Sequence, residues 1–218
     1  MFRPMRLRVT ETFFSVQGET SFAGRLCAFV RLTGCDLRCS WCDTTYSFTQ
    51  GDWRTFAALY AEIEGFGADY VCVTGGEPLL QKAVHGFMEE LLNQGKTVSL
   101  ETGGHRDIGE VDSRVHRIVD FKPPGSGETA KMRWANVPLL TQRDEAKFVL
   151  ADRTDYEWSL AVIAEHGLAE RVGHIYFSPV HGELEPRQLA EWMLADRVTA
   201  RLQLQLHKHI WGPNVQGV

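Results

Sequence analysis

The amino-acid sequence predicts an α/β fold, an incomplete and open βα barrel (partial TIM-like) of about six parallel strands. Two observations lead to this prediction. Short runs rich in β-branched and aromatic residues alternate with amphipathic helical patterns, which is typical of parallel strands joined by helical crossovers. Two of the crossovers, 103–115 and 123–128, carry no long helical pattern. A complete eightfold barrel is therefore not expected.

The expected strands and helices follow one another along the whole chain. The strand-forming runs are 26–32, 70–74, 97–101, 116–120, 146–150, 172–177 and 201–206. The amphipathic helical patterns are 55–65, 79–93, 155–166 and 185–195. No repeat, low-complexity tract or linker interrupts this order, so we expect a single domain over residues 1–218.

Charge and composition narrow the classes of function. The formal net charge is −5, from 23 basic and 28 acidic side chains, and no basic tract stands out, which argues against nucleic-acid binding. The N-terminal segment lacks the apolar stretch of a signal peptide, and no apolar run is long enough to span a bilayer. We therefore expect a cytoplasmic protein without a membrane partner. The five cysteines, three of them close together, favour a reducing compartment and a metal site over disulfides.

Three of the cysteines stand at C-x3-C-x2-C spacing just after the first expected strand: Cys35, Cys39 and Cys42. Three clustered thiolates can hold a cuboidal [4Fe-4S] cluster and leave one iron open to another ligand. A zinc site completed by Cys27, Cys72 or a histidine is the alternative, because zinc also binds closely spaced cysteines. The sequence offers no second C-x2-C pair to complete it, and Cys27 and Cys72 lie in apolar strands, as buried cysteines do.

A second motif, Gly75-Gly76-Glu77-Pro78, runs from the end of the strand 70–74 into a helical pattern. Glycines at a strand end let a ligand approach the backbone, and a neighbouring carboxylate can accept hydrogen bonds from an ammonium group. Taken alone, the motif fits a simple turn and helix start equally well. It becomes informative only behind the cysteine triplet.

Together, the cysteine triplet and Gly-Gly-Glu-Pro resemble the two signature motifs of the radical S-adenosylmethionine (SAM) superfamily. In that superfamily the methionine moiety of SAM chelates the open iron, and the Gly-Gly-Glu loop holds its amino group. The resemblance implies a radical SAM core with Cys35, Cys39 and Cys42 as cluster ligands and with Gly76 and Glu77 in the SAM loop. It also implies that reductive cleavage of SAM yields a 5′-deoxyadenosyl radical that abstracts hydrogen from the substrate.

Four further segments are similar to one family of that superfamily, the 7-carboxy-7-deazaguanine synthases. These segments are 12–20 (TFFSVQGET), 29–35 (FVRLTGC), 41–44 (WCDT) and 205–208 (QLHK). The resemblance implies a ring-contracting lyase that converts 6-carboxy-5,6,7,8-tetrahydropterin to 7-carboxy-7-deazaguanine with loss of ammonia, in the biosynthesis of queuosine and related deazapurines. It further implies a Mg²⁺ requirement, a flavodoxin- or ferredoxin-type reductant and a homodimer.

This resemblance assigns the pterin substrate to one set of residues. They are Val16, Gln17, Gly18, Glu19, Arg31, Thr74, His207 and Pro213. The planar guanidinium of Arg31 suits a carboxylate, and Gln17 and Glu19 offer the donor and acceptor edges that a pterin ring needs. Simpler explanations stay open: an internal ion pair for Arg31, a surface turn at 17–19 and a structural hydrogen bond for His207.

SAM and magnesium are assigned to a second set by the same resemblance. The SAM contacts are Trp41, Cys42, Asp43, Gly76, Glu77, Thr102, Asp120, Phe121 and Lys122. Thr44 would bind Mg²⁺, an ion that takes few protein ligands and keeps its waters, although a simple turn residue is the alternative there. At Asp120 the chain departs from the family pattern, in which many relatives carry serine, so a side-chain contact to SAM at that position is in doubt.

Two other functions match part of the pattern. A radical SAM activase, which installs a glycyl radical on a partner protein, shares the cysteine loop and Gly-Gly-Glu but lacks the set Gln17, Arg31 and His207. A zinc-stabilised binding module needs a fourth ligand and predicts no SAM loop. About four irons with sulfide, or one zinc, per chain would separate the two classes.

Overall fold

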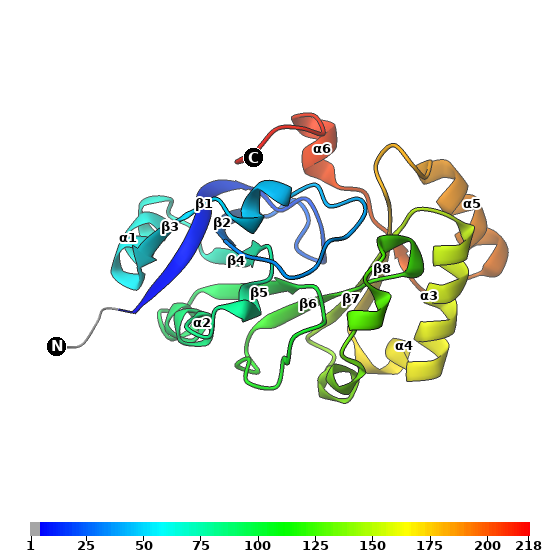
Figure 1. The fold of residues 1–218 in the computed structure, drawn as a ribbon, viewed down its shortest axis with the longest axis horizontal. Helices are drawn as coiled ribbons and strands as arrows, with labels where there is room; N and C mark the ends of the chain where they lie inside the picture. Colours follow the sequence, from blue (N-terminus) through cyan, green and yellow to red (C-terminus); the bar gives the residue numbers. More distant parts are fainter. Residues whose placement is uncertain (1–4) are drawn as a thin grey trace.

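The computed structural model describes residues 5–218, which form one nine-stranded sheet in the order β3-β1-β2-β4-β5-β6-β7-β8-β9 (Figure 1). Neighbouring strands are parallel from β2 to β9, whereas β1 pairs antiparallel with both β2 and β3. Because the order never returns to its first strand, the sheet is an open, partial βα barrel, and the predicted fold class is confirmed. The strands are β1 Arg6–Val16, β2 Leu26–Leu32, β3 Asp52–Thr55, β4 Tyr70–Gly75, β5 Thr97–Thr102, β6 His116–Phe121, β7 Glu145–Leu150, β8 His174–Pro179 and β9 Arg201–Leu202.

The helices lie mostly in the crossovers between parallel strands, as the alternating pattern predicts. The α-helices are α1 Phe56–Gly65, α2 Val84–Asn93, α3 Arg153–His166, α4 Leu168–Arg171, α5 Pro186–Asp196 and α6 Leu206–Ile210. Short 3-10 helices span η1 Thr45–Phe48, η2 Pro78–Leu80, η3 Pro124–Ser126, η4 Thr129–Lys131 and η5 Trp134–Leu139. Within residues 5–218, no helix has both the length and the apolar character needed to cross a membrane.

Two antiparallel strands, β1 and β3, were missing from the sequence prediction. The N-terminal half of β1 alternates in burial, with Leu7 and Val9 in the core and the charged Arg8 between them. Such alternation is typical of an antiparallel strand with one face toward water. The charged side chains of this segment conceal its strand pattern in the sequence.

Two expected elements were wrong in extent. The helix expected over 79–93 begins only at Val84, because Glu77 accepts a hydrogen bond from the backbone N–H of Leu79 (3.0 Å) and caps the short η2 instead. The strand expected over 201–206 is reduced to Arg201–Leu202, and Leu206 already starts α6. His207 therefore lies on a helix, not at a strand end as we expected.

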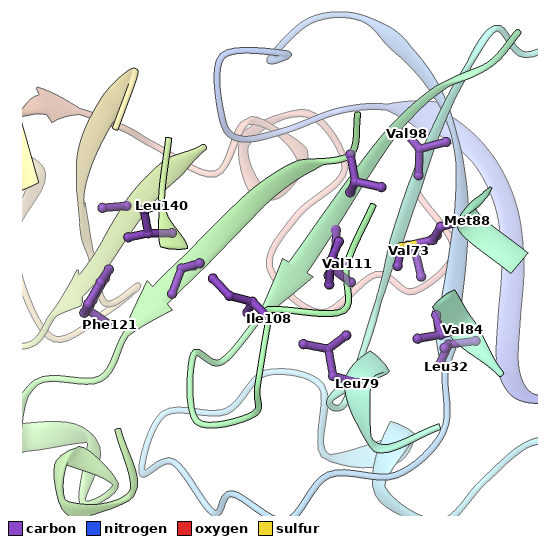
Figure 2. Packing of buried hydrophobic residues seen from close by; sticks show 14 of the residues in the cluster. Leu32, Val73, Leu79, Val84, Met88, Val98, Ile108, Val111, Phe121 and Leu140 are labelled. Carbon is purple, nitrogen blue, oxygen red and sulfur yellow. The ribbon is translucent and has the colours of Figure 1, made fainter. Parts of the chain in front are cut away.

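The two faces of the sheet carry different residues, because side chains alternate along a strand. On the outer face, strand residues such as Leu32, Val73 and Val98 share one apolar core with Val84 and Met88 of α2 (Figure 2). A smaller apolar cluster consists of alternate strand residues on the opposite face and one loop residue: Phe13, Phe22, Cys27, Phe29, Tyr70 and Cys72. Above this cluster, toward the carboxyl ends of the strands, the inner face becomes polar, and this is where a site can form.

The tyrosines give a test of the packing that depends on pH. Burial raises the pKa of Tyr46, Tyr156 and Tyr176 from 10.0 to about 12 and also raises the pKa of Tyr60 and Tyr70. An acid with a raised folded-state pKa stabilises the fold fully below its unfolded pKa, and this stability is lost as the pH rises through the folded pKa. We expect stability to fall between pH 10 and about 12, and we expect phenolate absorbance in the native protein to appear only near the upper end of that window. Native tyrosines that ionise with the unfolded pKa of 10.0 would contradict this packing.

Candidate functional site

A cleft of about 600 Å³ opens over the carboxyl ends of the strands. Its walls come from the strand ends, the cysteine loop, α6 and the segment 213–218. Nearly all residues that the sequence assigned to substrate, SAM and metals line it: Val16, Gln17, Gly18, Glu19, Arg31, Cys35, Cys39, Trp41, Cys42, Asp43, Thr44, Thr74, Gly76, Thr102, Asp120, Lys122, His207 and Pro213. Glu77 and Phe121 do not line the cleft.

Hydrogen bonds within the cysteine loop and to the neighbouring loop 122–128 fix the conformation of the cysteine loop. Arg38 donates from its guanidinium to the carbonyl of Cys35 (2.8 Å), and its backbone N–H donates to Glu128 (2.5 Å). The Ser40 backbone N–H donates to the Ser126 carbonyl (3.1 Å). These bonds leave Cys35, Cys39 and Cys42 as free, partly buried thiols on the cleft wall.

The two remaining cysteines lie apart from the triplet. Cys27 and Cys72 are fully buried in the small apolar cluster of the inner face, and burial raises the pKa of Cys72 well above its usual value. Their prediction as core residues is confirmed. Among residues 5–218, no three His, Cys, Asp or Glu side chains are placed to hold one metal ion. The cysteines of a cuboidal cluster bind different irons and need not meet at one point.

The Gly-Gly-Glu loop packs directly against the start of the cysteine loop. The backbone N–H of Glu77 donates to the Gly34 carbonyl (2.8 Å), and that of Gly76 donates to the Leu32 carbonyl (3.1 Å). A Cβ atom at Gly76 would lie 2.2 Å from the Gly34 oxygen and 2.8 Å from the Cβ of Cys35. Only glycine fits at this position. The close packing of the two loops brings Gly76 to the cleft wall beside the cysteines.

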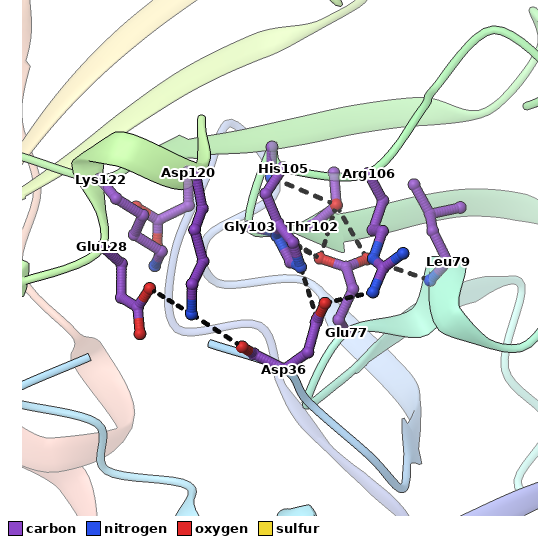
Figure 3. Close-up of polar contacts among 12 residues, drawn as sticks. Asp36, Glu77, Leu79, Thr102, Gly103, His105, Arg106, Asp120, Lys122 and Glu128 are labelled. Carbon is purple, nitrogen blue, oxygen red and sulfur yellow. Dashed lines mark hydrogen bonds and ion pairs between the residues drawn. The ribbon is translucent and has the colours of Figure 1, made fainter. Parts of the chain in front are cut away.

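The Glu77 side chain turns away from the cleft and ties neighbouring loops together (Figure 3). Its carboxylate accepts hydrogen bonds from the Thr102 hydroxyl (2.9 Å) and from the backbone N–H groups of Gly103 (2.8 Å) and Leu79 (3.0 Å). Its exposed fraction is 1%, and burial raises its pKa. In this structure Glu77 and Thr102 hold each other, and the loop reaches the cleft through its backbone.

The end of β6 brings a partly buried ion pair to the cleft. The Lys122 ammonium lies 2.8 Å from Asp120. Burial tends to lower the pKa of Lys122, but the Asp120 carboxylate outweighs burial and raises it. The Phe121 side chain points to the outer core and stacks on Phe148 at 5.2 Å between ring centroids. Only the backbone of Phe121 is left to contact a ligand.

Polar side chains also line the inner face between the apolar cluster and the cysteine loop. Thr74 donates to one oxygen of Glu101 (2.8 Å), and the Gln17 amide lies within hydrogen-bond distance of the other (3.4 Å). Glu101 was not predicted. The signal in the sequence was a carboxylate at an inward-facing position near the end of an apolar strand, directly beside Thr102.

A second, largely buried ion pair joins β7 to the loop after β1. Lys147 pairs with Glu19, whose other oxygen accepts a hydrogen bond from the Gln205 side chain (2.8 Å). Burial tends to raise the pKa of Glu19, but Lys147 and Gln205 outweigh it and lower that pKa. Burial tends to lower the pKa of Lys147, but the Glu19 carboxylate outweighs it and raises that pKa. Lys147 was also missed, although a lysine inside the apolar run 146–150 was a visible signal.

Arg31 forms the ion pair that the simpler explanation proposed. Its Nε lies 2.7 Å from Glu11, which also accepts a hydrogen bond from the Tyr46 hydroxyl (2.9 Å). Among the described residues, the hydrogen bonds of Arg31 use Nε alone, and the residue still lines the cleft. Internal pairing and ligand binding are therefore compatible, because a guanidinium has five donors.

The segment 203–208 and α6 cover the cysteine loop from the other side. The Leu206 backbone N–H donates to the Gly18 carbonyl (3.1 Å), and Lys208 lies 2.8 Å from Asp43. Burial tends to raise the pKa of Asp43, but Lys208 and the Thr44 hydroxyl outweigh it and lower that pKa to about 2. Burial lowers the pKa of His207, which favours a neutral imidazole at the cleft.

Comparisons with known proteins agree with this geometry. Residues 29–193 match the family model of the Radical SAM superfamily. The chain is 47% identical over 215 residues to a 7-carboxy-7-deazaguanine synthase from Chlorobaculum tepidum, covering 97% of both chains. It is 42% identical over 226 residues to the enzyme of that name from Koribacter versatilis, covering 97% of this chain and 100% of the relative. The crystal structure of QueE from Escherichia coli shares the fold, with a TM-score of 0.76, 22% identity, and coverage of 92% of this chain and 94% of that one.

Proposed function

Since the chain belongs to the 7-carboxy-7-deazaguanine synthase family of the radical SAM superfamily, we propose that its cleft holds SAM and 6-carboxy-5,6,7,8-tetrahydropterin side by side. The protein is a radical SAM lyase of deazapurine biosynthesis, and it forms 7-carboxy-7-deazaguanine with loss of ammonia. One observation carries the proposal. The three cysteines, Gly76 and the predicted pterin contacts, which come from distant parts of the chain, line one cleft.

The residues present suit a [4Fe-4S] cluster and SAM. Cys35, Cys39 and Cys42 supply three thiolates from one short loop, and their number leaves one iron without a protein thiolate. The backbone at Gly76 packs directly against Gly34 and the Cβ of Cys35, so this loop lies beside the proposed cluster ligands. When bound and reduced, the cluster supplies the electron that cleaves SAM.

The protein's own part in the reaction is to position the substrate. Arg31 is held by Glu11 through Nε and presents its remaining donors to the substrate carboxylate. Gln17, Thr74 and Glu101 offer donor and acceptor groups to the edge of the pterin ring. The segment 213–218 supplies part of the cleft wall.

Magnesium is part of the proposal through Thr44. Its hydroxyl hydrogen is donated to Asp43 (2.8 Å), so the lone pairs of the oxygen remain for a cation. A single hydroxyl, together with waters and the substrate carboxylate, is an environment that Mg²⁺ accepts. We also propose a flavodoxin- or ferredoxin-type reductant, a homodimer and a cytoplasmic location, which family membership and the free cysteines support.

The test of the function is anaerobic incubation of the reconstituted protein with SAM, dithionite, Mg²⁺ and the carboxytetrahydropterin, followed by mass spectrometry. We expect 7-carboxy-7-deazaguanine and ammonia, with little net loss of SAM. An activase would instead cleave SAM without changing the pterin, and a zinc module would do neither.

The variant Arg31→Lys makes this test specific for the substrate site. Lysine keeps the charge but has one ammonium group, which cannot hold Glu11 and fork onto a carboxylate at the same time. We expect unchanged iron content and SAM binding, turnover lowered about a hundredfold, and release of 5′-deoxyadenosine without product. Wild-type turnover in this variant would remove Arg31 from the proposed substrate site.

A further inference from the structure

His105 lies in the loop after β5, outside the set of residues that the proposed function uses. Only 4% of its side chain is exposed. Its Nε2 lies 2.7 Å from Asp36, and its Nδ1 lies 3.6 Å from Glu77. Figure 3 shows the imidazole between these two carboxylates. Nδ1 has no hydrogen-bond partner among the described residues, so it faces Glu77 at ion-pair distance.

The two carboxylates belong to the cysteine loop and to the Gly76-Glu77 loop, which act on the same SAM molecule in the proposed function. Asp36 follows Cys35 directly in the cysteine loop. Glu77 ends the Gly-Gly-Glu sequence, and its carboxylate also fixes Thr102 and Gly103. The imidazole therefore joins the loop of the cluster ligands to the loop of the SAM backbone contacts through side chains alone.

The local packing around His105 is so close that a side chain at Gly103 would collide with its neighbours. A Cβ atom at Gly103 would lie 3.1 Å from Nδ1 of His105, 3.4 Å from Glu77 and 2.9 Å from Leu37. Leu37 is itself buried in the cysteine loop, with an exposed fraction of 3%. The bare backbone at Gly103 lets His105, Glu77 and the cysteine loop meet at one point.

We propose that His105 is a positioning residue that sets the cysteine loop at a fixed distance from the Gly76-Glu77 loop, so that one SAM molecule can reach both. The proposal rests on the proposed function, in which the first loop carries the cluster and the second contacts SAM. A ligand that bridges two loops is sensitive to their separation, because a displacement of about 0.5 Å already spoils a preorganised site. His105 touches neither SAM nor the cluster in this proposal; it acts through Asp36 and Glu77.

The test compares His105→Ala, His105→Gln and His105→Asn with Arg106→Ala. The glutamine amide can take the place of Nε2 and keep a donor for Asp36, whereas the shorter asparagine cannot reach Asp36. Arg106 also pairs with Asp36, but it is 41% exposed and makes no hydrogen bond or ion pair with Glu77 among the described residues. It is the matched control. For each protein, iron and sulfide content, the Kd for SAM and the change that SAM causes in the electron paramagnetic resonance spectrum of the reduced cluster are measured.

We expect His105→Ala and His105→Asn to keep full iron and sulfide, to bind SAM at least about tenfold more weakly, as supporting residues of metal sites typically do, and to show a smaller spectral change. His105→Gln should recover most of the affinity, and Arg106→Ala should behave as wild type. Equal SAM affinity in His105→Asn and His105→Gln would overturn the proposal. This comparison decides the question even if His105→Ala does not fold. Loss of the cluster in all three His105 variants would overturn it as well, because His105 would then maintain the cluster loop itself. A wild-type protein that holds a cluster but binds no SAM would instead overturn the proposed function.

Discussion

Replacing Cys35, Cys39 or Cys42 singly by alanine is expected to abolish the visible absorption of the cluster and all cleavage of SAM. In the proposed function each thiolate would bind a different iron, and no further cysteine among residues 5–218 lies at the cleft. The remaining cysteines, Cys27 and Cys72, are fully buried in the apolar cluster of the inner face. The measurements are iron and sulfide content after anaerobic reconstitution and 5′-deoxyadenosine formation. We expect loss of both in all three variants.

The matched controls are Cys27→Ala and Cys72→Ala. Each removes a small buried side chain and is expected to lower the free energy of unfolding by about 1 kcal/mol while leaving the iron content unchanged. Loss of the metal in Cys27→Ala would show that the assignment of three ligands is wrong.

Replacing Lys147 by methionine is expected to lower the free energy of unfolding by about 3–5 kcal/mol, because it leaves the Glu19 carboxylate buried without its counterion. Only 14% of the Lys147 side chain and 11% of the Glu19 side chain are exposed, so water compensates the lost partner only in part. Urea unfolding of matched anaerobic preparations, followed by circular dichroism, measures the effect.

The double variant Lys147→Met/Glu19→Gln serves as the control. The amide oxygen of glutamine still accepts the hydrogen bond that Gln205 gives to Glu19 (2.8 Å), and no charge remains to be compensated. We expect the double variant to regain most of the lost stability. If the single variant is as stable as the double variant, the ion pair does not hold β7 to the loop after β1.

The parallel strands were predictable because a strand buried on both faces is apolar along its whole length, as in β4. The segment 201–206 shows where such reasoning fails. Its leucines alternate with polar residues, and a strand with buried leucines was the natural reading. In the structure Gln203 is buried and donates to the Thr20 carbonyl (3.2 Å), while Leu202 and Leu206 are 39% and 37% exposed. Hydrogen bonds to a loop that is distant in the sequence determine the conformation of this segment, and a local sequence pattern cannot reveal them.

The candidate site divides in the same way. Residues within short motifs, such as the cysteine triplet and Gly76, were assigned to one site by the sequence, and in the structure they line one cleft. Residues that join the site through the fold, such as Glu101 and Lys147, were not found, because nothing near them in the sequence resembles a motif. Glu77 belongs to a motif, yet its side chain serves the neighbouring loops, and only the three-dimensional contacts could show this.

The contacts of the segment 203–208 have a consequence for the order of folding. Gln205 reaches Glu19 across 186 residues of sequence, and Lys208 reaches Asp43 across 165. Contacts of such separation form late, because the chain must close a very long loop first. On the ribosome the cysteine loop is therefore synthesised and exposed well before its cover exists. Cluster insertion can precede the completion of the fold, and during this interval the half-built site is open to oxidation.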